Sequence, residues 1–220
     1  MSLKQFIIER IHHKSEQCVW TAVDFLDLGN RDAVDKVLQR LVKTKELRRI
    51  DRGLYDNPKI NSLTGQPDVP NYQKIIEAVA RRDQVRILID GLTSANDLGL
   101  TNIVPGQVVI LTDGRLRPIK VQNLTIKFKY TAPSKLYWSD KSAMRIVQAL
   151  HWLKDVINNK DPTECLLIKN KLVTILKNSK QKELLLTDLH EGLHTLPNWM
   201  QIFLKEIFSL IEKNSQVKQI

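Results

Sequence analysis

The sequence predicts an α+β protein, in which a helical module closed by a hairpin precedes a mixed α/β and helical domain. Three observations carry this prediction. Apolar residues recur at helical spacing over residues 31–43. Two short strand-like runs flank a glycine turn within residues 47–55. β-Branched runs at 85–89 and 108–112 alternate with helical patterns, and from residue 139 onward the pattern is helical throughout.

The N-terminal module can be predicted element by element. Apolar spacing indicates a helix over residues 3–13. Thr21 is an expected N-cap, because Asp24 stands three residues later as a capping box requires, and Asn30 can cap the helix that follows. A turn at residues 51–53 then joins two short strands. The order helix, short helix, helix and hairpin is that of a winged helix-turn-helix.

The expected domain boundary lies at residues 61–70, where turn-forming residues dominate and no periodicity is seen. This segment predicts a linker between a winged helix-turn-helix over residues 1–60 and an effector domain over residues 71–220. Within the effector domain, residues 119–121 and 124–130 are expected to be strands of a small sheet with two helices against it.

Three helix starts in the effector domain are predicted from local capping signals, and one of them is Asp161 as an N-cap followed by Pro162 at the first helical position. Ser94 to Asp97 has the pattern of a capping box that opens a short helix. Ser139 or Asp140 is expected to cap a helix that runs to Ile157.

The charge of the chain points to a polyanionic partner. Of 220 residues, 34 are Lys or Arg and 24 are Asp or Glu, giving a net charge of +10. Eight basic and only four acidic side chains fall within residues 30–52. Charge alone does not separate nucleic acid from an acidic protein or a lipid surface. Its concentration in the third helix and the hairpin favours nucleic acid.

Other features exclude several classes of protein. No apolar run approaches the ~18 residues of a membrane span, so no membrane is expected among the partners. Charges at Lys4, Glu9 and Arg10, without a small-residue cleavage site, argue against a signal peptide. Cys18 and Cys165 stand far apart and show no metal-ligand pattern. We therefore expect a cytoplasmic protein without a cofactor.

The polar side of the third helix is expected to enter the major groove of DNA. Arg31 and Gln39 suit base recognition, since Arg can pair with guanine and Gln with adenine. Lys36, Arg40 and Lys43 are expected to contact phosphates, which set the register without reading sequence.

The hairpin is expected to act as a wing along the DNA backbone or in the minor groove. Arg52 stands at its tip, and Arg48 and Arg49 lie on its first strand. Two aspartates of the third helix, Asp32 and Asp35, would repel phosphate unless Arg31 or Arg40 pairs with them or they accept from cytosine N4. The alternative is a surface helix whose solvent face is merely charged, followed by a basic loop.

Five short segments are distinctive in their sequence, order and spacing: FLDLGNRDAVD at residues 25–35, LRRIDRGLY at 47–55, ANDLGLT at 95–101, LTDG at 111–114 and LPNWM at 196–200. They resemble the AbiEi-type antitoxins of bacterial type IV toxin–antitoxin systems, the abortive-infection class. The resemblance extends over nearly the whole chain.

The resemblance implies a function in two parts. The N-terminal winged helix-turn-helix binds the promoter of its own operon and represses it. The domain after it counteracts a co-encoded nucleotidyltransferase-like toxin without needing a stable complex with that toxin. The resemblance implies that four arginines lie in the DNA-binding segment: Arg31, Arg40, Arg49 and Arg52. The expected partner is double-stranded DNA with inverted repeats, bound by a dimer or by two monomers, and no catalysis is expected.

One enzyme motif is also present. His190, Glu191 and His194 match HExxH, in which two histidines on one helix face bind zinc and the glutamate acts as general base. Gly192 weakens the helix within the motif, and Pro197 interrupts it three residues after the second histidine. A zinc-dependent hydrolase and a stand-alone winged-helix regulator therefore remain as alternatives to the antitoxin.

Overall fold

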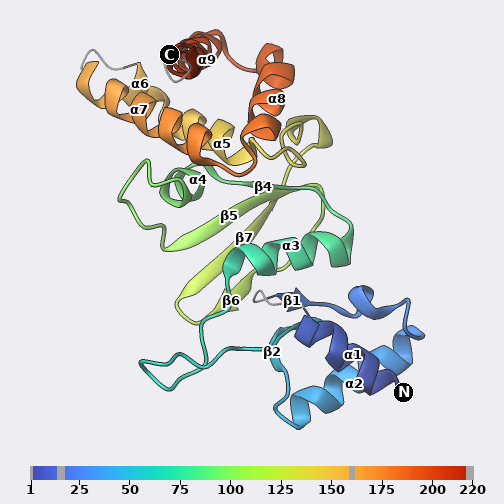
Figure 1. Ribbon diagram of the computed structural model, residues 1–220. Coiled ribbons are helices and arrows are strands. Elements are labelled where there is room, and N and C mark those ends of the chain that lie inside the picture. Colours follow the sequence, from blue (N-terminus) through green and yellow to red (C-terminus); the bar gives the residue numbers. More distant parts are fainter. Residues whose placement is uncertain (1, 14–17, 159–161, 217–220) are drawn as a thin grey trace. The chain divides into compact units, whose positions relative to one another are not determined.

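The computed structural model describes residues 2–13, 18–158 and 162–216, and Figure 1 labels their helices and strands in chain order. The mixture of helices and strands confirms the predicted α+β fold. Contacts divide the chain into two compact units, Met1–Ile87 with Thr112–Pro133 and Leu88–Leu111 with Ser134–Ile220. These units differ from the predicted boundary at residues 61–70, because residues 71–87 and 112–133 belong with the N-terminal module.

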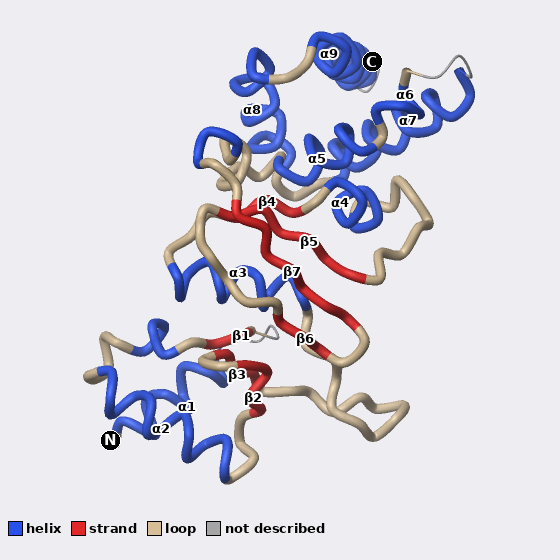
Figure 2. Tube along the Cα trace, turned by 180° about the vertical axis from the view of Figure 1, so that it is seen from behind, coloured by secondary structure: helices blue, strands red, loops and turns tan. Residues whose placement is uncertain are grey.

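The N-terminal module of the first unit consists of α1 (Leu3–His13), β1 (Val19–Trp20), the 3₁₀ helix η1 (Ala22–Phe25), α2 (Arg31–Lys43), β2 (Arg48–Asp51) and β3 (Leu54–Asp56). The strands form an antiparallel sheet in the order β1-β3-β2. Both views show α1 and α2 together beside this sheet (Figures 1 and 2). The predicted helices and hairpin are therefore present, except that the short helix is a single 3₁₀ turn.

The core of the module is built from the apolar faces that the sequence pattern indicated. Phe25, Ile7, Val34, Leu38 and Leu41 are fully buried in one cluster. Burying side chains of this size contributes roughly 1.5–3 kcal/mol each. The helical stripe of α2 therefore faces inward, and its polar side is left outside.

The rest of the first unit is α3 (Tyr72–Asp83) and an antiparallel hairpin of β6 (Ile119–Val121) and β7 (Leu124–Tyr130). In the hairpin, Ile119 is opposite Ile126, and both side chains are buried. The segment predicted as a linker has local structure of its own. Asn61 Oδ1 accepts hydrogen bonds from the backbone N–H groups of Leu63 and Thr64 (2.9 and 3.1 Å).

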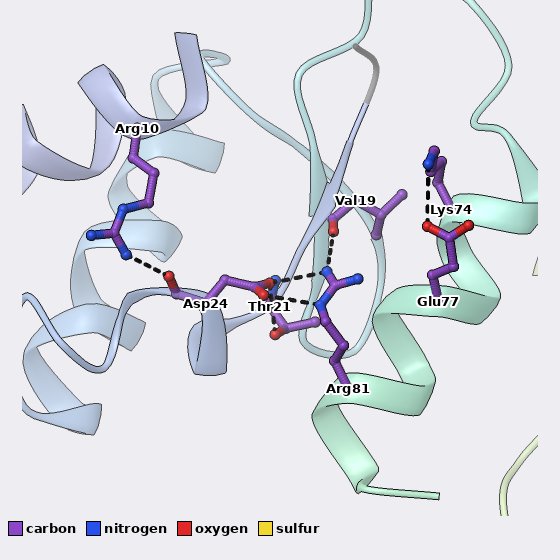
Figure 3. A network of polar contacts seen from close by, with 7 residues as sticks. All are labelled: Arg10, Val19, Thr21, Asp24, Lys74, Glu77 and Arg81. Atoms are coloured by element: carbon purple, nitrogen blue, oxygen red, sulfur yellow. Dashed lines mark hydrogen bonds and ion pairs between the residues drawn. The ribbon is translucent and has the colours of Figure 1, made fainter. Parts of the chain in front are cut away.

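A polar network around Asp24 joins α3 to the N-terminal module (Figure 3). The Asp24 carboxylate accepts from the backbone N–H of Thr21 (2.7 Å), which confirms the predicted capping box. Arg81 donates to the same carboxylate (3.1 and 3.4 Å) and to the carbonyl oxygen of Val19 (3.1 Å). Arg10 donates to the carbonyl oxygen of Asp24 (2.8 Å). The carboxylate of Asp24 thus connects η1 to α3, and its backbone carbonyl connects the same turn to α1.

The second unit contains two strands and most of the helices: β4 (Ile87–Ile89), α4 (Gly91–Asp97), β5 (Gln107–Thr112), α5 (Met144–Trp152), α6 (Lys154–Ile157), α7 (Pro162–Asn178), α8 (Lys182–Gly192), the 3₁₀ turn η3 (Leu193–Thr195) and α9 (Asn198–Gln216). A further 3₁₀ turn, η2 (Pro133–Lys135), stands at its border. Figure 2 shows helices α5 to α9 of this unit. Leu150, Leu172, Leu189 and Leu204 are fully buried in its large core.

Of the three predicted helix starts, the one at Pro162 is confirmed, although its expected cap Asp161 lies outside the described residues, and the other two are wrong. Helix α4 begins earlier, because Asp90 accepts from the backbone N–H of Thr93 (3.1 Å) and its hydroxyl (2.6 Å). Helix α5 begins at Met144, and the buried carboxylate of Asp188 accepts from the N–H of Ala143 just before it (3.2 Å). Ser139 and Asp140 cap no helix there. No helix among the described residues is long and apolar enough to cross a membrane.

We predict that Asp24→Ala destabilises the protein by about 1–2 kcal/mol, because it removes a capping box and the acceptor of Arg81 together. Urea unfolding followed by circular dichroism measures the change. Asp32→Ala is the matched control, since the exposed Asp32 side chain has no hydrogen-bond or ion-pair partner among the described residues. Equal stability of the two variants would contradict the role given to Asp24.

We predict that Gly192→Ala lowers the free energy of unfolding by about 1–3 kcal/mol, because a Cβ at this position would overlap the buried indole ring of Trp138. The control is Gly106→Ala, where an added Cβ meets open space. It should change stability by less than about 0.5 kcal/mol. A Gly192→Ala protein as stable as the control would show that the indole can move aside.

Candidate nucleic-acid interface

Helix α2 separates an apolar face from a polar one. The side chain of Asn30 opens the helix by accepting from the N–H of Ala33 (2.9 Å), as the sequence predicted. Val34, Leu38 and Leu41 turn inward and are fully buried. The side chains predicted to contact DNA from this helix are all exposed: Arg31, Lys36, Gln39, Arg40 and Lys43.

The donors on the polar face of α2 are largely unused. Arg31 Nε donates to Asp35 Oδ2 (2.9 Å), and the two side chains are 54% and 37% exposed. This pair offsets the charge of one of the two aspartates that would repel phosphate. Among the described residues, the side chains of Lys36, Gln39, Arg40 and Lys43 make no hydrogen bond or ion pair. Their donors are free for an external acceptor.

A residue of α3 holds the backbone at the tip of the β2–β3 hairpin. Gly53 has a φ of +68°, a conformation that a glycine adopts without strain, and this allows the tight turn after Arg52. The carbonyl oxygen of Arg52 accepts from Arg82 Nη1 (2.7 Å). The backbone of the tip is therefore anchored, while the Arg52 side chain is exposed.

Arg48 and Arg49 have different roles, although both were predicted to contact DNA. Arg48 donates through Nε and Nη2 to the two oxygens of Asp56 (2.9 and 2.6 Å), a residue only 1% exposed. A buried carboxylate needs such a partner, because an unpaired buried charge is costly. We therefore leave Arg48 out of the candidate interface. Arg49 is exposed, and its Nε donates only to the carbonyl oxygen of Asp51, at 3.4 Å.

Charge is distributed unevenly between the two units. The first unit carries 21 Lys and Arg against 13 Asp and Glu, a net charge of +8. The second carries 13 against 11, a net charge of +2. Most of the electrostatic field that would attract a polyanion therefore originates in the unit that contains α2 and the hairpin.

Sequence reasoning missed three arginines near the hairpin tip. Arg82, Arg115 and Arg117 line a cleft together with Arg31 and Arg52. Arg82 follows an unremarkable helical pattern, and the other two lie in a segment predicted only as a connection between strands. No local signal distinguishes them, because their proximity to Arg52 arises from packing within the first unit.

The HExxH segment lacks the helix that its zinc chemistry requires. Helix α8 ends at Gly192, so His190 lies on the helix and His194 in the following 3₁₀ turn. The ring of His190 stacks on Phe208, with centroids 4.1 Å apart. His194 Nδ1 donates to the carbonyl oxygen of Glu191 (2.9 Å). Among the described residues, no group of three or more His, Cys, Asp or Glu side chains is placed to hold a metal ion.

The glutamate of this motif takes part in an ion-pair network. Lys141 Nζ lies 3.4 Å from Glu191 Oε2 and 3.6 Å from Asp188 Oδ1. Partial desolvation disfavours the charged lysine, but the hydrogen bond to Glu191 and the neighbouring carboxylates outweigh it and raise the pKa of Lys141. Glu191 thus serves here as the partner of a charged lysine, a role consistent with structural stabilisation.

Comparison with known proteins identifies a family but no function. A model described as a family of unknown function, DUF6088, matches residues 6–184. No curated protein matches the chain. Because the family model spans well over half of the sequence, the chain belongs to the DUF6088 family.

Proposed function

We propose that residues 1–60 are a winged helix-turn-helix that binds double-stranded DNA, and that the protein represses the promoter of its own operon. The observation that carries this proposal is the exposed basic face of α2 beside the anchored, basic tip of the β2–β3 hairpin. In this assignment α2 is the recognition helix and the hairpin is the wing. The net charge of +8 on the first unit supports it.

The contacts divide by chemistry. Arg31 and Gln39 read base edges in the major groove, where their side chains can form paired hydrogen bonds. The other basic side chains bind phosphates and set the register: Lys36, Arg40 and Lys43 on α2, and Arg49 and Arg52 on the hairpin. A phosphate can replace the Asp51 carbonyl as the acceptor of Arg49, since that internal hydrogen bond is long.

We further propose that the protein is a non-enzymatic antitoxin of the type IV class. This part of the proposal rests on the resemblance of five ordered segments to AbiEi-type antitoxins. It gives residues 71–220 the task of opposing a nucleotidyltransferase-like toxin encoded beside it. Since type IV antitoxins act on the effect of the toxin, a stable complex between the two proteins is not required.

We predict that Arg31→Ala reduces the preference for the protein's own upstream DNA over a scrambled duplex of equal length by about 1–3 kcal/mol, because a base contact is lost. Lys36→Ala should instead weaken both duplexes alike and lower the slope of log K against log salt by about 0.9, because a phosphate contact is lost. Fluorescence anisotropy at several salt concentrations measures both.

The control for both variants is Lys127→Ala, an exposed lysine of β7 that lies outside α2 and the β2–β3 hairpin. It removes one positive charge from the same unit and should leave the preference unchanged. Equal affinity of the unaltered protein for its own and for scrambled DNA would contradict the proposed repressor.

We predict that expression of the protein restores growth to cells that express an adjacent nucleotidyltransferase-like gene. Arg31→Ala and Lys36→Ala should retain this protection when both genes are driven from unrelated promoters, because protection is assigned to residues 71–220. Growth counts after induction measure it. If the toxin remains toxic under every condition in which this protein is expressed, the proposed antitoxin function is refuted. The protein would then be a stand-alone regulator.

A further inference from the structure

The first unit contains a cleft of about 480 Å³ whose walls are rich in arginine. Its basic lining residues are Arg31, Arg52, Arg82, Arg115 and Arg117, and its apolar lining includes Phe128. They come from the start of α2, the β2–β3 turn, the end of α3, the segment before β6, and β7. The size lies within the range of roughly 300–1,000 Å³ that is usual for small-molecule sites.

The arginines of this cleft differ in how far their donors are already used. Arg82 is committed to the protein: it donates to both oxygens of Asp83 (2.9 and 2.7 Å) and to the carbonyl of Arg52. Within the residues that the structure describes, the side chains of Arg52, Arg115 and Arg117 have neither a hydrogen bond nor an ion pair. Three guanidinium groups therefore border the cleft with all their donors free.

The segment that carries Arg115 and Arg117 is fixed at its start. Asp113 accepts from the backbone N–H of Arg86 (2.9 Å) and from its Nε (3.0 Å). Partial desolvation disfavours the Asp113 carboxylate, but these hydrogen bonds outweigh it and lower its pKa, so the anchor stays charged at neutral pH. The guanidinium groups are thus attached to an anchored wall.

The balance of charge leaves the cleft cationic. Five arginines and two aspartates, Asp51 and Asp83, line it, for a net charge of +3, and Asp83 is already paired with Arg82. Free guanidinium groups bind phosphate oxygens in paired, charge-assisted hydrogen bonds. The apolar residues Leu116 and Phe128 add a surface that a bare phosphate does not need, but that a base or another organic group can cover.

We propose that this cleft binds a small ligand of nucleotide size that carries a polyphosphate group. Arg52, Arg115 and Arg117 hold the phosphates, and Phe128 contacts the organic part. Because Arg31 and Arg52 belong both to the cleft and to the proposed DNA interface, ligand and DNA compete for them. The ligand therefore acts as an inducer that releases the promoter, and this consequence alone rests on the proposed function.

Ligand binding is tested first without DNA. Isothermal titration of the full chain uses ATP and inorganic triphosphate as probes, at constant ionic strength and without divalent metal. We expect saturable binding of one ATP per chain, weakened about tenfold or more in the Arg115→Ala/Arg117→Ala double variant. The control is Lys127→Ala/Lys129→Ala, which removes the same charge from exposed positions of β7 that do not line the cleft.

The outcomes separate specific recognition from general attraction. If neither probe shows saturable binding, the proposal is overturned. It is also overturned if the two double variants lose the same affinity for ATP, because that result would indicate attraction by net charge. Binding of triphosphate as tight as that of ATP supports the phosphate site and removes Phe128 from it. Thermal unfolding of each variant checks that the cleft variant is folded.

The regulatory step is tested by adding ATP to a preformed complex with upstream DNA at fixed salt. We expect release of DNA from the unaltered protein and about tenfold less sensitivity to ATP in the Arg115→Ala/Arg117→Ala variant. If ATP binds but DNA is not released, competition is refuted while the site stands. A different outcome is that neither ATP nor triphosphate binds, while the Arg115→Ala/Arg117→Ala variant binds duplex DNA more weakly. In that case the cleft is part of the DNA-binding surface and the proposal fails.

Discussion

The carboxylate of Asp24 is the interaction on which the first unit depends most. It accepts hydrogen bonds from the backbone N–H of Thr21 at the start of η1 and from the Thr21 hydroxyl (3.0 Å). It also accepts one from the guanidinium of Arg81, 57 residues further along the chain. Because the residue is only partly exposed, these hydrogen bonds are weakly screened by water. The turn before α2 and the last turns of α3 are thereby fixed to one another.

Two consecutive arginines of α3 extend this constraint to the candidate interface. Arg81 holds η1 through Asp24, and Arg82 holds the backbone of the hairpin tip through the carbonyl of Arg52. The backbone of the hairpin tip is therefore held by a helix that lies beyond residues 61–70, the segment predicted as a linker.

Sequence reasoning succeeded where the cause is local. The buried stripe of α2, its Asn30 cap and the glycine turn at Gly53 all depend on residues within a few positions of each other, and the structure confirms them. It failed where the partner is distant. The N–H at the start of α5 is capped by Asp188, 45 positions away, and no property of the local sequence could favour this carboxylate over the nearer Ser139.

The same limit applies to the arginines, and it decides what they can do. In the sequence, Arg48 and Arg52 are equivalent positive charges around one turn, and Arg82 stands 30 positions beyond Arg52. In the structure, Arg48 neutralises the buried Asp56 and Arg82 supports the hairpin tip, so the donors of both are used within the protein. Only a guanidinium without an internal acceptor, such as that of Arg52, can bind a phosphate without first breaking a stabilising contact. A functional surface of this protein is therefore defined by which basic side chains the fold leaves unpaired, and the number of basic residues in a segment is a weaker guide to it.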